Sequence, residues 1–234
     1  MITITDEQEA YLKSLGEKDL ERAQAYAHDL VVGLKTIRSF PQGVAVFGSA
    51  RIKEDHPDYK LARSLGQELA KNGHAVITGG GPGIMEAANR GSFEYGGRSI
   101  GLNILLPHEQ HSNPYLTDSL LFKYFFARKV MLAKSVKVYV FFPGGFGTFD
   151  ELSEILVLMQ EGKMPRMPIF LIGKSFWKDL DKFFAKHMVP RKLILSKDRE
   201  IYTITDNIND VVKAANKIGH PKVGDNYYDS FTKP

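Results

Sequence analysis

The segment from Pro143 to Glu151, Pro-Gly-Gly-Phe-Gly-Thr-Phe-Asp-Glu, contains the residues best suited to chemistry. It follows a continuous apolar run, Val138 to Phe142, which is the pattern of a buried parallel strand, and it leads into a helical pattern. A helix that begins here presents free backbone N–H groups and the positive end of its dipole to an anion. We therefore predict an anion site with a carboxylate, Glu151, one turn inside the helix. The residues of this predicted loop are Gly144, Gly145, Gly147 and Thr148.

The same residues also permit a purely structural interpretation. Thr148 and Glu151 have the T-x-x-E spacing of a capping box, in which the glutamate side chain binds the backbone N–H of the first residue. A single cap does not require three glycines and a proline, and this excess of backbone freedom favours a ligand. Both interpretations start the helix at Thr148.

Two more glycine-containing loops follow predicted strands. One follows residues 44–47, and the other runs from Gly79 to Gly83, where Pro82 suits the first turn of a helix. Ligands of open α/β sheets bind at the carboxyl ends of the strands, so these loops should converge on one crevice. The binding residues predicted here are Gly48, Ser49, Gly80, Gly81, Gly83 and Glu86.

Arg128 and Lys129 begin a helix that follows another predicted strand, residues 120–124. Either cation could reach the same edge of the sheet. Neighbouring helical positions point about 100° apart, so only one of the pair can aim squarely into the crevice. Arg128 is the stronger candidate because it lies between two ligand loops, and Lys129 is a second candidate binding residue.

Short apolar runs alternate with helical stretches from residue 44 onward, which predicts βαβ units and a mostly parallel sheet flanked by helices. We predict strands near residues 44–47, 75–78, 99–104, 120–124, 137–142, 168–172 and 200–203. We predict helices near residues 58–72, 82–95, 126–135, 148–161, 175–188 and 207–217.

The chain divides into three predicted parts: an N-terminal helical extension (1–40), the α/β domain (41–219) and a C-terminal tail (220–234). The apolar face predicted for the extension consists of Leu20, Ala23, Ala27, Leu30, Val31, Leu34 and Ile37. The extension contains no glycine loop or candidate catalytic group. We therefore expect it to be dispensable for any chemical step.

Composition excludes several classes of protein. The 234 residues include no cysteine, which excludes disulfides and thiolate metal sites, and neither a membrane span nor a signal peptide is evident. We expect a cytoplasmic protein. The formal charge of +4 suits an anionic small molecule, but the basic residues are scattered, so we do not expect nucleic-acid binding. The segment His108-Glu109-Gln110-His111 lacks H-E-x-x-H spacing, and we predict no metal site.

Four motifs together resemble those of the LONELY GUY (LOG) family, cytokinin riboside 5′-monophosphate phosphoribohydrolases that are often labelled lysine decarboxylases. They are G-S-A at 48–50, G-G-G-P-G-I-M-E-A-A-N-R-G at 79–91, R-K at 128–129 and P-G-G-F-G-T-F-D-E at 143–151. The resemblance spans about residues 43–215. At Glu86 and at 125–127 the chain is similar to the longer bacterial branch of the family.

The resemblance implies a Rossmann-like fold, usually a homodimer, and hydrolysis of the N-glycosidic bond of a nucleoside 5′-monophosphate to free base and ribose 5-phosphate. It assigns the catalytic roles to Arg128 and Glu151 and the phosphate loop to residues 144–148. AMP and cytokinin riboside monophosphate are both candidate substrates, and no metal or redox cofactor is required. The main alternative is a non-catalytic nucleotide-binding regulator of the same fold. A pyridoxal-phosphate decarboxylase is disfavoured because no lysine stands in a Schiff-base context.

Overall fold

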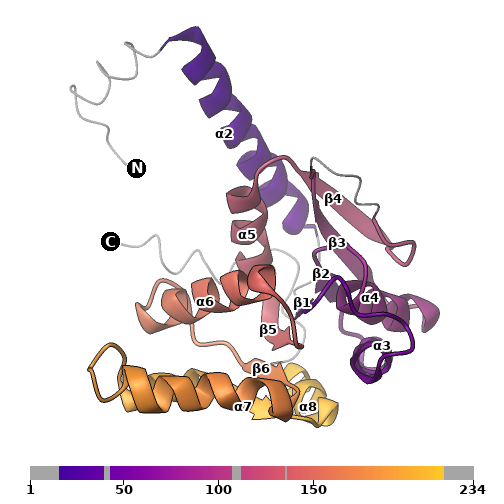
Figure 1. Ribbon diagram of the computed structural model, residues 1–234. Helices are drawn as coiled ribbons and strands as arrows, with labels where there is room; N and C mark the ends of the chain where they lie inside the picture. Colours follow the sequence, from indigo (N-terminus) through magenta and orange to yellow (C-terminus); the bar gives the residue numbers. More distant parts are fainter. Residues whose placement is uncertain (1–15, 40–42, 107–111, 135, 219–234) are drawn as a thin grey trace.

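The computed structural model describes residues 16–39, 43–106, 112–134 and 136–218 (Figure 1). It contains one sheet in the order β4-β3-β2-β1-β5-β6-β7, in which every neighbouring pair of strands is parallel. The predicted α/β fold with a parallel sheet is confirmed. The strands are β1 (Gly43–Phe47), β2 (Val76–Thr78), β3 (Ser99–Ile104), β4 (Asp118–Phe122), β5 (Val136–Phe141), β6 (Ile169–Ile172) and β7 (Tyr202–Thr205).

The strand order reverses beside β1. From β1 the chain adds β2, β3 and β4 outward on one side, and β5 then returns to the other side of β1. Loops leaving β1 and β5 therefore diverge to opposite faces of the sheet and leave a crevice between them at its carboxyl edge. This switch point is where the two loops with the strongest sequence signals meet.

Helices cover both faces of the sheet because successive residues of each strand point to opposite sides. In β1, Ala45 and Phe47 face one hydrophobic cluster, whereas Val44 and Val46 face the other. The first cluster receives side chains from α2 (Glu17–Ile37), α5 (Phe125–Lys134), α6 (Phe146–Gln160) and α7 (Lys174–Phe183). The second receives side chains from α3 (Pro57–Lys71), α4 (Ile84–Glu94) and α8 (Ile208–Ile218).

Several predicted boundaries differ from those in the structure. Strand β4 ends at Phe122 rather than at residue 124, because the N–H groups of Lys123 and Tyr124 bind Asp29 of α2 instead of a neighbouring strand. Strand β7 begins at Tyr202, since residues 196–201 form a 3₁₀ helix. The helix predicted over 175–188 is α-helical only to Phe183 and continues as a π-helix from Phe184 to Met188.

The described part of the N-terminal extension is the long helix α2, which runs past α5 and β4 while its first half extends away from the sheet (Figure 1). Its contact face agrees with the predicted one in part. Ile37 is buried, and Leu30 and Leu34 pack against the first cluster, as predicted. Leu20 and Val31 are instead 41% and 64% exposed, and Gly33, which was not predicted, is buried. The C-terminal tail lies outside the described residues.

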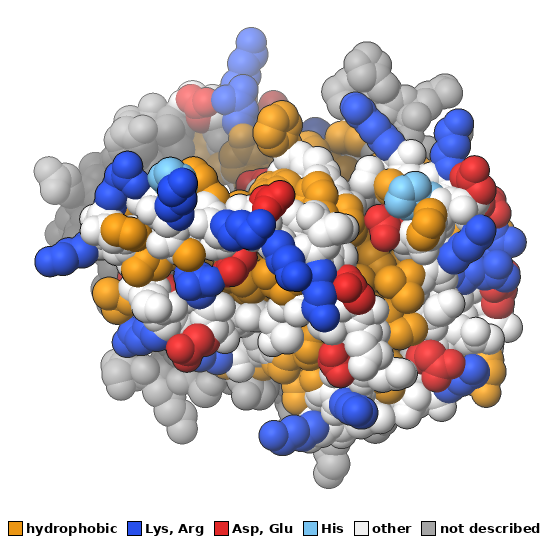
Figure 2. Space-filling view, turned by 60° about the horizontal axis from the view of Figure 1, so that its bottom comes forward, with side chains coloured by type: hydrophobic (Ala, Val, Ile, Leu, Met, Phe, Trp, Pro, Cys, Tyr) orange, Lys and Arg blue, Asp and Glu red, His pale blue; other side chains and the backbone are white. Residues whose placement is uncertain are grey.

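No helix among the described residues is long and apolar enough to cross a membrane. On the face of the molecule in Figure 2, lysine and arginine side chains are interspersed with aspartate and glutamate, and no single dense basic block is visible. The expectation that the chain does not bind nucleic acid stays a prediction.

Candidate active site

A cleft of about 850 Å³ opens at the carboxyl ends of β1 and β5, at the switch point of the sheet. It brings together most of the predicted site residues, including both predicted catalytic side chains, Arg128 and Glu151. Its lining consists of Phe47, Gly48, Ser49, Ala50, Arg51, Gly79, Met85, Arg128, Leu132, Gly144, Gly145, Phe146, Gly147, Thr148, Phe149 and Glu151.

Helix α6 points its N-terminus into this cleft. It begins at Phe146 with Gly145 as N-cap, two residues earlier than predicted, and its first hydrogen bonds run from the N–H groups of Thr148 and Phe149 to the carbonyl of Gly145. The N–H groups of Phe146 and Gly147 therefore have no acceptor within the helix. Because Thr148 is not the N-cap, the capping-box interpretation of Glu151 is wrong.

The three glycines of this loop have different environments. A Cβ on Gly144 would lie 2.1 Å from Oγ1 of Thr148, so a close contact within the fold requires glycine there. A Cβ on Gly145 or Gly147 would meet no atom within 4 Å, and neither residue has a positive φ. Nothing in the described fold requires these two glycines. Glycine within a helix costs about 1 kcal/mol relative to alanine, and a ligand that needs close approach to the backbone accounts for them.

The β1 loop joins the other two loops. The Ser49 N–H donates to the carbonyl of Pro143, and the Ser49 carbonyl accepts from the N–H of Ile84, both at 3.0 Å. Gly83, the N-cap of α4, has φ of 72°, and a Cβ there would lie 2.3 Å from the Ser49 carbonyl oxygen. Pro82 therefore precedes the N-cap. The prediction that it lies in the first turn of the helix is wrong.

The predicted binding residues Gly80, Gly81 and Gly83 do not line the cleft, and only Gly79 of this loop does. Gly80, like Gly83, is required by close packing: it has φ of 72°, and a Cβ there would collide with the side chain of Asn103. The N–H and side chain of Asn113 bind the carbonyls of Gly80 and Gly81, at 2.9 and 3.1 Å.

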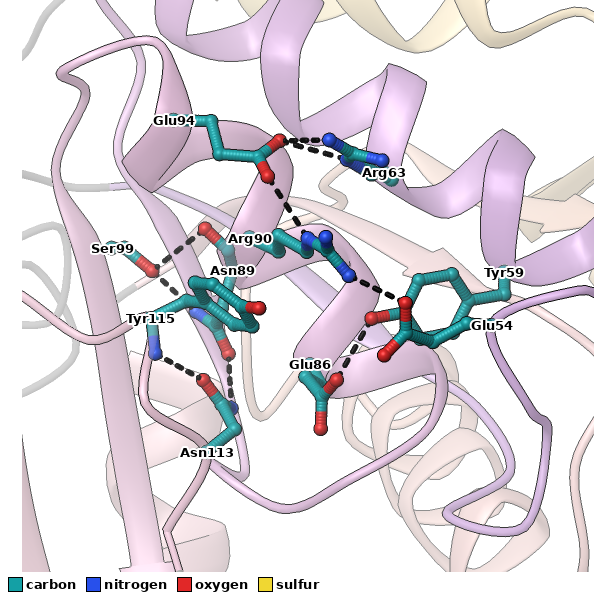
Figure 3. Close-up of polar contacts among 10 residues, drawn as sticks. All are labelled: Glu54, Tyr59, Arg63, Glu86, Asn89, Arg90, Glu94, Ser99, Asn113 and Tyr115. Carbon is teal, nitrogen blue, oxygen red and sulfur yellow. Dashed lines mark hydrogen bonds and ion pairs between the residues drawn. The ribbon is translucent and has the colours of Figure 1, made fainter.

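A buried polar network, which the sequence analysis missed, holds this loop from behind (Figure 3). Oδ1 of the Asn89 side chain accepts from Thr78 Oγ1 at 2.6 Å and from Asn113 Nδ2 at 3.1 Å, while Nδ2 of Asn89 donates to Ser99 Oγ. The Thr78 hydroxyl in turn accepts from the N–H of Gly80. The only sign of this network in the sequence is the presence of polar residues at strand and helix positions that the apolar pattern marks as buried.

Two predicted binding side chains are engaged elsewhere. Glu86 accepts a 2.8 Å hydrogen bond from the Tyr59 hydroxyl and does not line the cleft (Figure 3). The ammonium of Lys129 lies 2.9 Å from carboxylates of both Asp150 and Glu154 and so joins α5 to α6. Of the adjacent pair, Arg128 alone faces the cleft, as the helical geometry predicted.

Arg128 and Glu151 form a loose buried pair at the base of the cleft. Nη2 of Arg128 lies 3.5 Å from Oε1 of Glu151, with the two side chains 15% and 7% exposed. Nε of Arg128 is buried and has no hydrogen-bond partner among the described residues. A close ion pair would have a separation of about 2.8 Å, so both groups retain capacity to bind a ligand.

Burial raises the pKa of the Glu151 carboxyl to about 7, although Arg128 and Lys129 act in the opposite direction. Burial also lowers the pKa of Arg128, but the guanidinium stays charged because its ordinary pKa lies above 12. A carboxyl group that exchanges its proton near neutral pH is suited to general acid–base work.

The cleft offers cations but no Schiff-base amine. Among the described residues that line it, Arg51 and Arg128 are basic and none is a lysine. The chemistry of a pyridoxal-phosphate enzyme does not fit this residue set. No group of three potential metal ligands gathers among the residues that the structure describes, and His108 to His111 lie outside them. The prediction that no metal is needed remains untested.

The sheet is doubly wound and parallel, and a helix N-terminus and the buried Arg128–Glu151 pair lie at its switch point. This is the arrangement of a Rossmann-like protein that binds its ligand at the carboxyl edge of the sheet. A sequence model described as "Possible lysine decarboxylase" matches residues 85–215. The chain belongs to this family, the LOG family.

Three comparisons illustrate the relationship. The probable cytokinin riboside 5′-monophosphate phosphoribohydrolase LOG4 of Oryza sativa is 28% identical over 79% of this chain and 82% of its own length. A pyrimidine/purine nucleotide 5′-monophosphate nucleosidase of Escherichia coli is 27% identical over 61% of this chain, although over only 34% of its own length. The molybdenum cofactor carrier protein of Chlamydomonas reinhardtii shares the fold, with a TM-score of 0.54, 22% identity and coverage of 75% of this chain and 96% of its own.

The glycine environments predict opposite stability effects of two alanine substitutions. Gly144→Ala should lower the unfolding free energy by roughly 2 kcal/mol, because its Cβ would displace Thr148. Gly147→Ala should leave stability equal or raise it by up to about 1 kcal/mol, because alanine is the better helix former. Denaturant unfolding of both variants measures this difference. Equal destabilisation would contradict a ligand-related role for Gly147.

Ionisation of Glu151 should make stability fall as pH rises. Its pKa is about 7 in the folded protein, whereas an unfolded glutamate has a pKa near 4.3, so between these values the folded state holds a proton that the unfolded state has lost. In Glu151→Gln this dependence is absent. The unfolding free energy of the variant relative to wild type should therefore increase by on the order of 3–4 kcal/mol from about pH 4 to about pH 8. A difference that does not change with pH would show that Glu151 titrates like a solvated carboxyl.

Proposed function

We propose that this chain hydrolyses the N-glycosidic bond of a nucleoside 5′-monophosphate and releases the free base and ribose 5-phosphate. The observation that carries the proposal is the pairing of buried Glu151 and Arg128 beside a helix N-terminus whose two open glycines the fold does not need. The relatives named as phosphoribohydrolases and as a nucleotide nucleosidase support the same substrate class.

The 5′-phosphate would bind at the start of α6. The N–H groups of Phe146 and Gly147 are available there, and the helix dipole favours a negative charge. The side chain of Thr148 is next to this point, and Ser49 lies on the facing loop of the same cleft. Phosphate binding at one end of the cleft would align the ribose with the Arg128–Glu151 pair, so that remote binding energy serves the reacting centre.

Glu151 would act on the ribose. Departure of a base from C1′ develops positive charge on the sugar, as in glycoside hydrolysis, and a carboxylate held beside C1′ stabilises this charge and positions or activates water. The pKa near 7 lets Glu151 both accept and return a proton at neutral pH. Arg128 would bind the phosphate, the ribose hydroxyls or the departing base through its unpartnered Nε and its loosely held Nη2.

AMP and cytokinin riboside monophosphate remain the two candidate substrates, and a homodimer or a higher homo-oligomer is the expected assembly. The alternative, a non-catalytic nucleotide-binding regulator, has weaker support. Phosphate binding needs the N-terminus of α6 but gains nothing from a second, buried anion nearby, and burying a carboxylate is costly. The presence of Glu151 in the cleft therefore favours catalysis.

Incubation with AMP, followed by chromatography for adenine and ribose 5-phosphate, tests the function. Wild type should release both products, and Glu151→Gln should reduce the rate by roughly 10² while calorimetry still detects AMP binding. Adenosine, which lacks the phosphate, should be a poorer substrate than AMP by more than about tenfold in kcat/KM. Tight AMP binding by wild type without release of adenine would support the regulator instead.

Arg128→Ala should reduce kcat/KM for AMP at least about tenfold more than Lys129→Ala. The first substitution removes the cation that pairs with Glu151 in the cleft, whereas the second removes ion pairs to Asp150 and Glu154, which do not line it. Lys129→Ala is thus the matched control, because it deletes a neighbouring charge on the same helix. The reverse order would place the substrate on the Lys129 side of α5.

A further inference from the structure

The N-terminal helix α2 is hydrogen-bonded to the turn that leads into α5, the helix that contains Arg128. Oδ2 of Asp29 accepts hydrogen bonds from the backbone N–H groups of both Lys123 and Tyr124, at 2.8 and 3.0 Å. These two residues end the path from β4 and immediately precede the first residue of α5, Phe125. The carboxylate also places a negative charge at the N-terminus of α5, where the helix dipole favours it.

Packing around Asp29 leaves this contact little freedom to shift. The ring of Tyr26 meets Tyr124 and Phe126 edge-on, with centroid separations of 4.5 and 5.3 Å. A Cβ on Gly33 would lie 2.9 Å from atoms of Met131 and Phe122, so α2 approaches both β4 and α5 closely. The face of α2 that contains these residues therefore fixes the position and orientation of α5.

The path from Asp29 to Arg128 is short. Asp29 binds the N–H of Tyr124, and the carbonyl of Tyr124 accepts the backbone N–H of Arg128 at 3.3 Å. The guanidinium carbon of Arg128 also lies 5.3 Å from the ring centroid of Phe125, the residue that follows the turn bound by Asp29. A change in the turn would move both the backbone and the side-chain support of Arg128.

We propose that Asp29 is a positioning residue that sets the distance between the Arg128 guanidinium and Glu151, and so makes the N-terminal helix part of the catalytic apparatus. The catalytic half of this statement rests on the proposed hydrolase function. The inference replaces the expectation from sequence that residues 5–38 are dispensable for the chemical step. That expectation considered only groups able to touch a substrate, and Asp29 acts through the backbone of another element.

The test compares Asp29→Ala with Asp29→Asn in the full chain. Alanine removes both hydrogen bonds, whereas asparagine keeps an oxygen acceptor and caps helices nearly as well as aspartate. Asp29→Ala should lower kcat for AMP about tenfold with little change in KM, because a small displacement of a reacting group has a large effect on rate. Asp29→Asn should retain most of the wild-type kcat. Glu21→Ala, at an exposed position of the same helix, is the control and should match wild type.

A second measurement does not depend on turnover. Carbon-13 NMR titration of the Glu151 carboxyl, assigned with Glu151→Gln, reports its local charges, which come from Arg128, Lys129, Glu154 and Asp150. Withdrawal of the Arg128 guanidinium should raise the pKa of Glu151 in Asp29→Ala but not in Asp29→Asn. A role in stability alone would lower the melting temperature and leave this pKa unchanged.

The outcomes separate the two proposals. If wild type does not hydrolyse AMP, the proposed function fails, and the titration still decides whether Asp29 positions Arg128. If Asp29→Ala has the pKa of Glu151 and the kcat of wild type, the positioning role is overturned. Should Asp29→Ala not fold, Asp29→Glu serves in its place: it keeps the charge but moves the carboxylate by one methylene, and should shift both readouts in the same direction by a smaller amount.

Discussion

The burial of two opposite charges, Arg128 and Glu151, at the base of one cleft is the constraint around which the rest of the site is built. Removing each ion from water costs several kcal/mol, and at 3.5 Å their attraction offsets this only in part. The fold keeps the charges slightly apart instead of closing them into a tight pair. Burial raises the pKa of Glu151 even beside Arg128, and Nε of Arg128 has no hydrogen-bond partner among the described residues.

Such a pair can persist only if the helices that carry it are held from outside the cleft. Lys129 joins α5 to α6 through Asp150 and Glu154, and Asp29 of α2 holds the turn that begins α5. None of these side chains lines the cleft. In the proposed mechanism, the distance between Arg128 and Glu151 therefore depends on residues that do not touch the reacting atoms.

The glycine-rich loops divide the remaining work between packing and binding. Gly83 and Gly144 are required by close contacts within the fold, whereas Gly145 and Gly147 open onto the cleft. The network around Asn89 fixes the loop behind Gly79, and Ser49 connects that loop to the start of α6. A run of glycines in the sequence therefore does not have one meaning. Each position must be assigned from what its missing side chain would meet.

Local patterns in the sequence were enough to determine the parallel α/β sheet, the positions of most elements within two residues, and the cleft that contains Arg128, Glu151 and the loop at 144–148. Apolar runs fix strands, and the topology of such sheets fixes the edge at which their loops meet. The sequence did not determine which glycines face a ligand, that Glu86 binds Tyr59, or that α6 starts at Phe146. It also gave no sign that Asp29 reaches Lys123, because that contact spans 94 positions along the chain. These features depend on distances between elements, and only the packing of α2, α5 and α6 on the sheet sets those distances.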